Sequence, residues 1–260
     1  MTVKLIDSHC HIDDDRYDSC RDEVVTRARD NGIAQIILPA TTADRWQKVK
    51  QVAAMYDQIF PAYGLHPMFM AQHKRQHLQD LDAWIDREKP VAVGECGLDF
   101  FQSRDDEIWQ LELFQAQLSL ARKHQLPVIV HVRKAMDQVI SLLRKSKLEC
   151  GGVIHSFAGS LQQARQLYEL GFKLGIAATV DFERARKLRN VVVKIDADAL
   201  LLESDAPDQP GINHRGDLNE PAFIVEHFQT MAQLRGISEQ RFSEILNRNT
   251  RAIFSRIDHH

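Results

Sequence analysis

The 260-residue sequence lacks the features of a secreted or membrane-anchored chain. No apolar run approaches the ~20 residues that a membrane-spanning helix requires. The opening stretch, MTVKLIDSHC, has neither a basic leader nor a small-residue cleavage site, so we expect no signal peptide. The 4 cysteines show no C-x-x-C spacing, which predicts reduced thiols in a cytoplasmic protein.

The sequence also lacks an excess of positive charge. Its formal net charge is −3, which argues against bulk attraction to nucleic acid. Any anionic substrate must therefore be captured by local charge or by metal. Linkers, low-complexity segments and Pro/Gly-rich hinges are missing as well, so we expect residues 1–260 to form a single domain.

What the sequence does have is a regular alternation of short apolar runs and longer amphipathic stretches. The apolar runs are VKLID, AQIILPA, IFPAYGL, VAVGEC, PVIVHV, GGVIHSF, FKLGIA and ALLLESD. Amphipathic stretches such as 22–32, 106–125 and 161–171 lie between them. Apolar strands joined by helices indicate parallel strands covered on both faces. The size and strand count predict an α/β fold, a (β/α)8 TIM-type barrel, with an open doubly wound sheet as the alternative.

The first apolar run ends in two closely spaced histidines, in KLIDSHCHID. If the strand continues through them, Asp7, His9 and His11 share one face and Cys10 lies on the other. Two imidazoles held on one rigid strand form half of a metal site. Two unrelated histidines near a terminus are the alternative reading of this stretch alone.

Further metal-ligand types recur at the ends of other predicted strands. These residues are Glu95, His131, His155 and Asp205. In a barrel the carboxyl ends of all strands meet at one face, where the active sites of this fold lie. So many imidazoles and carboxylates brought together require cations among them. These candidate ligands are more numerous than the four that one tetrahedral ion binds. Their number suits two metals that share a bridging carboxylate.

Three stretches carry a resemblance to a known family. LIDSHCHID, PVIVHVRKAMD and LLLESDAP resemble the signature stretches of the TatD-related metal-dependent deoxyribonucleases of the amidohydrolase superfamily, and the resemblance extends to NRNTRAIF. One departure is Glu203-Ser204-Asp205, where the family more usually has Glu-Thr-Asp. Because serine keeps the hydroxyl, we expect this exchange to matter little.

The resemblance implies a complete set of ligands. His9, His11 and Asp205 would hold one metal, His131 and His155 the second, and Glu95 would bridge them. Asp205 and Glu95 would be catalytic in metal-assisted hydrolysis by a metal-bridged hydroxide, with Asp205 as the proton acceptor. Nitrogen-rich ligation favours zinc or manganese over magnesium, and the identity of the two divalent ions stays open.

Other residues are candidates for contacts around the metals. His66 and Arg133 are expected to contact a phosphate, and Arg133 could bind it with both guanidinium nitrogens. Asp99 is expected to orient a ligand imidazole. Asn219 is a substrate-site candidate by its family counterpart. The basic stretch 183–189 could contact a polynucleotide or be a solvated helix face.

Two remaining stretches have a plainer interpretation. The acidic run Asp13–Asp15 is expected to be a solvated loop, with Asp13 a candidate for supporting the ligands. His259 and His260 are either native or the remnant of a tag.

The function implied by the resemblance is 3′–5′ exonuclease-type hydrolysis of DNA at chain ends. An amidohydrolase or aminoacyl-tRNA deacylase would use the same metals on a carbonyl. A third possibility is a metal-holding barrel that binds a partner without turnover. The predicted partner is DNA as substrate, with no membrane and no obligate protein partner.

Overall fold

The computed structural model describes residues 3–258, so the two C-terminal histidines lie outside the described residues. Within this range all eight predicted strands form. Their bounds are β1 Leu5–Asp7, β2 Ile33–Pro39, β3 Ile59–Ala62, β4 Val93–Asp99, β5 Val128–Arg133, β6 Gly152–Ile154, β7 Phe172–Ile176 and β8 Leu200–Leu202. Neighbouring strands pair in parallel in the orders β1-β2-β3 and β4-β5-β6-β7-β8.

Backbone hydrogen bonds join these two sheets on both sides. Gly94 donates from its backbone nitrogen to the carbonyl of Tyr63 at 2.9 Å, which connects β3 with β4. On the other side, Ser8 donates to the carbonyl of Leu202 at 2.9 Å, which connects β8 with the end of β1. The sheet is therefore closed, and the fold is the predicted TIM-type barrel rather than an open doubly wound sheet.

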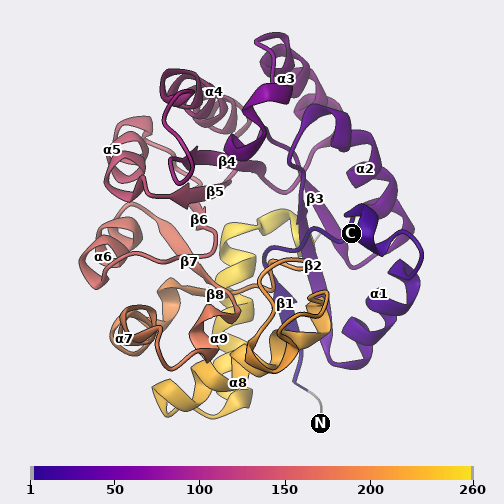
Figure 1. Ribbon diagram of the computed structural model, residues 1–260, viewed down its shortest axis with the longest axis vertical. Coiled ribbons are helices and arrows are strands. Elements are labelled where there is room, and N and C mark those ends of the chain that lie inside the picture. The colour runs from indigo at the N-terminus through magenta and orange to yellow at the C-terminus, as the bar shows by residue number, and fades with distance from the viewer. Residues whose placement is uncertain (1–2, 259–260) are drawn as a thin grey trace.

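Helices surround the barrel (Figure 1). They are α1 Arg21–Asp30, α2 Trp46–Met55, α3 Gln76–Glu88, α4 Glu107–His124, α5 Met136–Ser146, α6 Leu161–Glu169, α7 Arg186–Lys194, α8 Ile224–Arg235 and α9 Glu239–Ile253. Most follow a strand and bury an apolar stripe against it, such as Val139, Ile140 and Leu143 of α5. Helix α6 begins with a capping box, in which Ser160 and Gln163 each accept a hydrogen bond from the other's backbone nitrogen.

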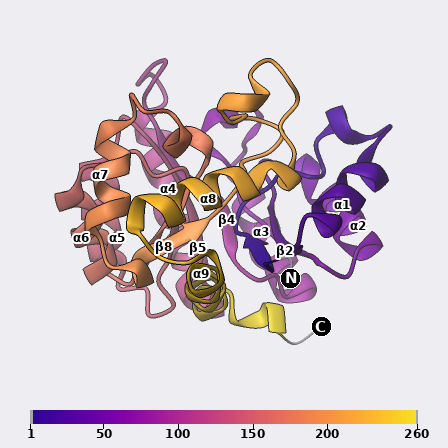
Figure 2. The same cartoon turned by 90° about the horizontal axis from the view of Figure 1, so that it is seen from below.

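The interior of the barrel is apolar at its N-terminal end. Its buried side chains include Ile6, Ile37, Phe60, Ile129, Val153 and Leu201. Ile253, Phe254 and Ile257, at the end of α9 and just beyond it, belong to the same buried cluster. Figure 2 shows α9 at the end of the molecule opposite the long loops that follow the strands. The end of the chain thus closes one end of the barrel, and the predicted ligands lie towards the other.

The structure corrects the expected path of the first strand. Strand β1 ends at Asp7, and His9 and His11 follow it in a loop, so their side chains are not placed by strand alternation. The Asp7 carboxylate accepts hydrogen bonds from the backbone nitrogens of His9 and Ser204 at 3.1 and 3.0 Å. The turn after β1 is therefore fixed by Asp7, which faces this backbone instead of lying beside the two imidazoles.

Within residues 3–258, no helix has the length and apolar character needed to cross a membrane.

Candidate metal centre

Glu95, on β4, lies at the centre of the site with only 1% of its surface exposed. Its two carboxylate oxygens face different groups of imidazoles. Oε2 lies 3.1 Å from His9 Nε2 and 3.5 Å from His11 Nε2. Oε1 lies 3.0 Å from His66 Nε2 and 3.1 Å from His131 Nδ1. One carboxylate therefore connects two clusters of nitrogen ligands, as a bridging residue must.

The first cluster contains His9, His11 and Asp205, as the sequence predicted. The Nε2 atoms of His9 and His11 are 3.1 Å apart, and Asp205 Oδ1 lies 3.7 Å from His9 Nε2. His155 packs its ring against that of His9, with 3.6 Å between centroids. Its Nε2 lies 3.3 Å from Asp205 Oδ1. His155 thus lies beside the first cluster.

The second cluster contains His66, Glu95 and His131. The rings of His66 and His131 are 4.4 Å apart, whereas those of His131 and His155 are 6.5 Å apart. His66, predicted as a substrate contact, therefore occupies a ligand-like position in this geometry. The assignment of His131 and His155 to one metal stays a prediction.

The position of His131 depends on one close approach of backbone and one side-chain contact. The register of β4 and β5 pairs Gly97 with His131. A Cβ on Gly97, at φ 144°, would lie 2.0 Å from the His131 carbonyl oxygen, so only glycine fits beside this ligand. The same register pairs Asp99 with Arg133, and Asp99 Oδ2 lies 2.9 Å from His131 Nε2. Asp99 is therefore in contact with the imidazole that it was expected to orient.

The electrostatics of the cluster favour bound cations. Burial raises the pKa of Glu95, but the imidazoles of His66, His9 and His155 hold it well below its ordinary value. Burial also lowers the pKa of His155, but the carboxylates of Asp205 and Glu203 raise it well above its ordinary value overall. The carboxylates thus attract a proton to His155, whereas burial lowers the pKa of His9 and His66, and divalent cations compete with protons for such nitrogens.

The donors present fit divalent metal ions. Two imidazole nitrogens and two carboxylate oxygens converge in the first cluster, and both Nε2 atoms there face the same oxygen of Glu95. Two neutral imidazole nitrogens at such a distance direct their lone pairs at the same space, and two protonated ones repel, so a shared metal cation is the partner that suits both. The buried Nδ1 of His9 also has no hydrogen-bond partner. Imidazole and carboxylate together are the ligand set of zinc, manganese and similar ions.

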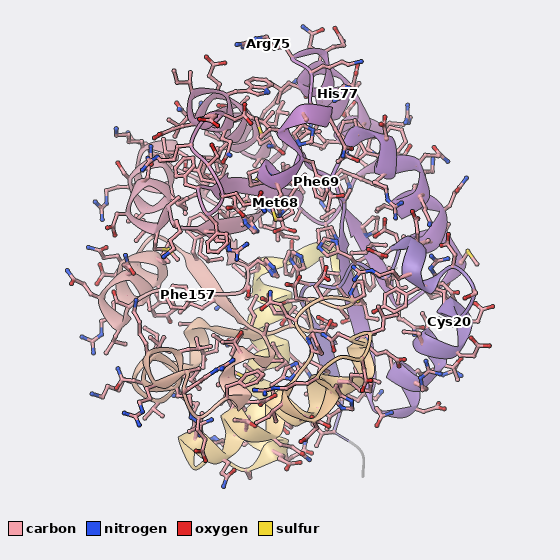
Figure 3. All side chains as sticks on the ribbon, in the orientation of Figure 1. Cys20, Met68, Phe69, Arg75, His77 and Phe157 are labelled. Carbon is pink, nitrogen blue, oxygen red and sulfur yellow. The ribbon has the colours of Figure 1, made fainter. Side chains whose placement is uncertain are left out.

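A cavity of about 820 Å³ opens above these ligands. Met68, Phe69 and Phe157 line it, and Figure 3 shows the first two on one side of the barrel axis and Phe157 on the other. Arg133 also lines the cavity, and its guanidinium carbon lies 3.5 Å from the ring centroid of Phe101. Phe101 is 52% exposed. The mouth therefore combines a cation, exposed aromatic surface and the metal ligands.

The acidic run after β1 also borders the cavity and is not simply solvated. Asp13 is buried, and the guanidinium of Arg45 donates to its carboxylate at 3.0 and 3.2 Å. Asp15 pairs with Arg45 at 2.7 Å and with Lys48 at 2.5 Å. Every cation in this network is already matched by a carboxylate, so this part of the rim offers no free positive charge.

Comparisons with known proteins agree with this geometry. A family model described as TatD related DNase matches residues 6–255. The chain belongs to this family. It is 36% identical to YjjV of Escherichia coli K12, named an uncharacterized metal-dependent hydrolase, over 98% of this chain and 99% of YjjV. YabD of Bacillus subtilis, named in the same way, is 30% identical over 96% and 98% of the two chains.

One solved structure gives the same assignment, and a second shows the same fold. The crystal structure of YjjV, described as a TatD homologue, has a TM-score of 0.95 and covers 98% of this chain and 99% of its own. A TatD family hydrolase from Entamoeba histolytica has a TM-score of 0.85 at 22% identity, covering 98% and 99%, and shows the fold alone.

The TatD-like stretch 203–205 includes a residue that sequence reasoning missed. Glu203 is fully buried, and its Oε1 lies 3.0 Å from His155 Nδ1 and accepts a hydrogen bond from the Ser156 backbone nitrogen at 2.5 Å. A Cβ on Gly175 would lie 2.0 Å from Glu203 Oε2, so β7 leaves room for this carboxylate. The sequence signal for Glu203 was its position directly after β8, the strand that also leads to Asp205. Glu203 holds the imidazole of His155 from below the cavity.

Ser204, where the family more usually has threonine, uses its hydroxyl. Its Oγ donates to Asp7 Oδ2 at 2.6 Å and accepts from the backbone nitrogen of Ala206 at 3.1 Å. Burial raises the pKa of Asp7 to about 7 despite these bonds. The hydroxyl therefore links β1 to the turn that carries Asp205.

Asn219 does not face the cavity, which corrects its expected substrate contact. It is fully buried, and its amide donates to the carbonyls of Ser204 and Asp208 at 2.9 and 2.7 Å. Its Oδ1 accepts from the backbone nitrogen of Glu220 at 2.9 Å. Both ends of the amide are thus used within the protein. Asn219 supports the loop that carries Asp205.

Proposed function

We propose that this protein is a metal-dependent deoxyribonuclease that binds two divalent ions and removes nucleotides from DNA chain ends. The family assignment gives the coarser class: the chain is a metal-dependent hydrolase of the TatD family. The observation that supports a phosphodiester substrate is Arg133, an exposed cation on the rim of a cavity that also contains the metal ligands.

Arg133 is suited to bind a phosphate. It lies two residues beyond His131 on β5, and its guanidinium stacks on Phe101. No carboxylate within the described residues 3–258 forms an ion pair with it. A stacked guanidinium keeps its nitrogen donors free in a fixed plane, and two of them can bind two phosphoryl oxygens. A neutral amide substrate would gain little from this group.

Two divalent ions, when bound to these ligands, would lower the pKa of a water molecule and neutralise charge on a phosphoryl oxygen. His9, His11 and Asp205 would hold one ion, His131 and His155 the second, and Glu95 would contact both. Arg133 would hold the remaining phosphoryl oxygens as negative charge increases in the transition state.

Asp205 is the proposed proton acceptor. Burial raises its pKa, but His155 and His9 hold that pKa well below its ordinary value, so the carboxylate is ionised near neutral pH. The side-chain amide of Gln209 donates to its Oδ2, which fixes the orientation of the carboxylate. Asp205 would accept a proton from the attacking water and return it to the leaving oxygen.

The shape of the mouth supports action at chain ends. The ligands lie at the bottom of a cavity walled by Phe157 and the segment 66–72, and a flexible single strand can reach them. A continuous duplex is stiff and does not bend into such a cavity, so it would rest on the surrounding loops. We therefore expect exonucleolytic cleavage of single-stranded or frayed ends.

The test compares linear and circular single-stranded DNA of the same sequence, with RNA, aminoacyl-tRNA and simple amides in parallel and several divalent metals. Stepwise shortening of the linear DNA and a stable circle are expected. Efficient cutting of the circle would indicate endonuclease action. Hydrolysis of amides or aminoacyl esters with no action on DNA would reject the proposal.

A further inference from the structure

A second basic and aromatic patch lies on two segments that also contribute residues to the cavity wall, apart from Arg133. It consists of Phe182, Arg184 and Arg215, which we call the Phe182 patch. The guanidinium carbons of Arg184 and Arg215 lie 5.2 and 4.8 Å from the ring centroid of Phe182. Both arginines are exposed, and Phe182 is partly exposed. Two cations from distant parts of the chain thus share one aromatic ring.

Both chain segments that form the patch also contribute residues to the wall of the cavity. Phe182 follows the short helix Ala178–Asp181 after β7, and Thr179 of that helix lines the cavity. Arg215 belongs to the loop after β8, in which Asp208 and Gln209 line the same cavity. A chain extending from the metal ligands across this side of the rim would meet the patch.

Both segments are anchored on α8, so the patch is preformed. Asp181, next to Phe182, has a buried carboxylate whose Oδ2 lies 3.4 Å from Nδ1 of the buried His227. In the other segment, His214 Nε2 lies 2.9 Å from Glu226 Oε1, and Asn213 donates to Glu226 Oε2 at 3.1 Å. The residue before Phe182 and the residue before Arg215 therefore contact consecutive residues of one helix, the first by close approach of buried side chains and the second by a hydrogen bond. A rigid site loses less entropy on binding than a mobile one.

The charge of this part of the rim differs from that of the loop after β1. Arg184, Arg186, Lys187 and Arg215 are exposed here, against the exposed carboxylates of Glu183 and Asp217. No ion pair involves these four cations within the described residues. By contrast, Arg16, Arg45 and Lys48 in the other network are paired with carboxylates. A polyanion that extends out of the cavity is therefore attracted to the unpaired cations near the Phe182 patch, whereas the paired cations after β1 offer it little net attraction.

We infer that the Phe182 patch is a binding subsite for single-stranded nucleic acid, in which a base stacks on Phe182 and the flanking phosphates contact Arg184 and Arg215. Aromatic rings with adjacent cations bind single strands in this way, because every base has a stacking face and every linkage a charge. This inference rests on the proposed nuclease function and adds to it the path of the strand beyond the metal centre.

Binding is measured by fluorescence anisotropy with a labelled oligothymidylate of about 12 nucleotides, within the range of single-strand site sizes, whose phosphorothioate linkages resist hydrolysis. Phe182→Leu should weaken binding at least about fivefold, which corresponds to the lower limit of one base–aromatic stack, about 1 kcal/mol. The double variant Arg184→Gln/Arg215→Gln should reduce the slope of log Kd against log salt by about 1.4, at about 0.7 per charge for single strands.

The matched control is Arg165→Gln/Arg241→Gln, which removes two exposed arginines from α6 and α9 and should leave affinity and salt slope unchanged. Thermal unfolding checks that each variant is folded. If Phe182→Leu does not fold, the double variant Arg184→Gln/Arg215→Gln alone tests the subsite. Turnover adds a second readout: the loss of kcat/KM on an oligonucleotide should exceed the loss on bis(4-nitrophenyl) phosphate at least about fivefold.

The outcomes separate the two proposals. Folded variants that bind the oligonucleotide like the wild type, while the wild type degrades DNA, would overturn the subsite and leave the nuclease proposal intact. A wild type that neither binds nor hydrolyses any oligonucleotide would overturn both. Weaker binding of RNA in the same variants, with unchanged binding of DNA, would reassign the subsite to RNA and reject it for DNA.

Discussion

At the N-terminal end of the barrel, Phe254 and Ile257 bury apolar surface between the strands, whereas at the C-terminal end His9 and Glu95 bury groups that carry charge. Each buried apolar side chain of this size stabilises the fold by about 1.5–3 kcal/mol. A buried charge instead costs free energy unless a partner compensates for it.

The two ends use the same strands, and the change occurs over two residues. Val153 belongs to the apolar interior and His155 to the ligand cluster, and Leu201 and Glu203 have the same relation. Along each of these strands, one inward-facing position thus carries an apolar core residue and the next carries a candidate metal ligand or its partner. The closed end therefore stabilises the fold by apolar packing, whereas the buried charges of the open end need partners that compensate for them, a role that bound cations would fill.

The largest effect should come from removing the metals. After thorough chelation with EDTA, hydrolysis should be lost almost completely and the melting temperature should fall, because the ions bind the folded protein and not the unfolded chain. Elemental analysis should find about two divalent ions per chain before chelation and a return of activity when they are restored. Full activity in the chelated protein would contradict the metal mechanism.

Glu95→Gln should have the next largest effect on activity. The amide keeps the size of the side chain but removes the charge between the two clusters, so at least one metal should be lost. Turnover should fall more than about 100-fold, beyond the effect of losing a supporting residue. Metal content and kcat measure this, with the exposed Glu149→Gln as the control. Normal kinetics with both metals bound would show that Glu95 is not the bridge.

Phe254→Ala tests the closed end. Phe254 is fully buried among the interior side chains, so the variant should lose about 3–5 kcal/mol of unfolding free energy through lost burial and a cavity. Metal content and kcat of the folded fraction should stay near wild type, because no ligand contacts this region. Met55→Ala, at a side chain that is 62% exposed, is the control and should change stability little. A loss of metal in Phe254→Ala would show that the two ends are coupled.

Arg133→Ala tests the open end without touching a ligand. Turnover on DNA should fall by about 2–4 kcal/mol in transition-state free energy, the effect of losing one charge-stabilising donor. Metal content should be retained. The exposed Arg144→Ala on α5 removes the same charge elsewhere and should be neutral. Equal losses in the two variants would attribute the effect to net charge.

The sequence predicted the barrel because its strands are continuous apolar runs, which indicate parallel pairing, and because their number and the chain length match a closed sheet. It predicted the cluster of His9, His11 and Asp205 because these residues follow strand ends. Contacts within loops were not predictable in this way. Strand periodicity ends at Asp7, so the direction of the next side chains depends on hydrogen bonds between Asp7 and Ser204, which lies 197 residues further along the chain.

Two other residues also have contacts that the sequence pattern does not predict. The sequence assigns no role to Glu203, because a buried carboxylate and an exposed one look alike in a sequence, and only the space above Gly175 shows that it lies inside the barrel. Asn219 was assigned to substrate because its family position suggested the site. Its amide instead donates hydrogen bonds to backbone carbonyls, so it supports the loop after β8.

Asn219→Ala distinguishes these two roles and should have the smallest effect of the series. Removing the amide leaves the buried carbonyls of Ser204 and Asp208 without a donor, which should cost about 1–3 kcal/mol of unfolding free energy. KM for DNA should stay near wild type, because the side chain does not reach the cavity, while kcat should fall modestly as the loop with Asp205 becomes less rigid. Denaturant unfolding and steady-state kinetics on one preparation measure both. The exposed Asn190→Ala on α7 is the control for loss of an asparagine. A raised KM at unchanged stability would restore Asn219 as a substrate contact, and would mean that the open end of the barrel extends deeper into the loop after β8 than its hydrogen bonds indicate.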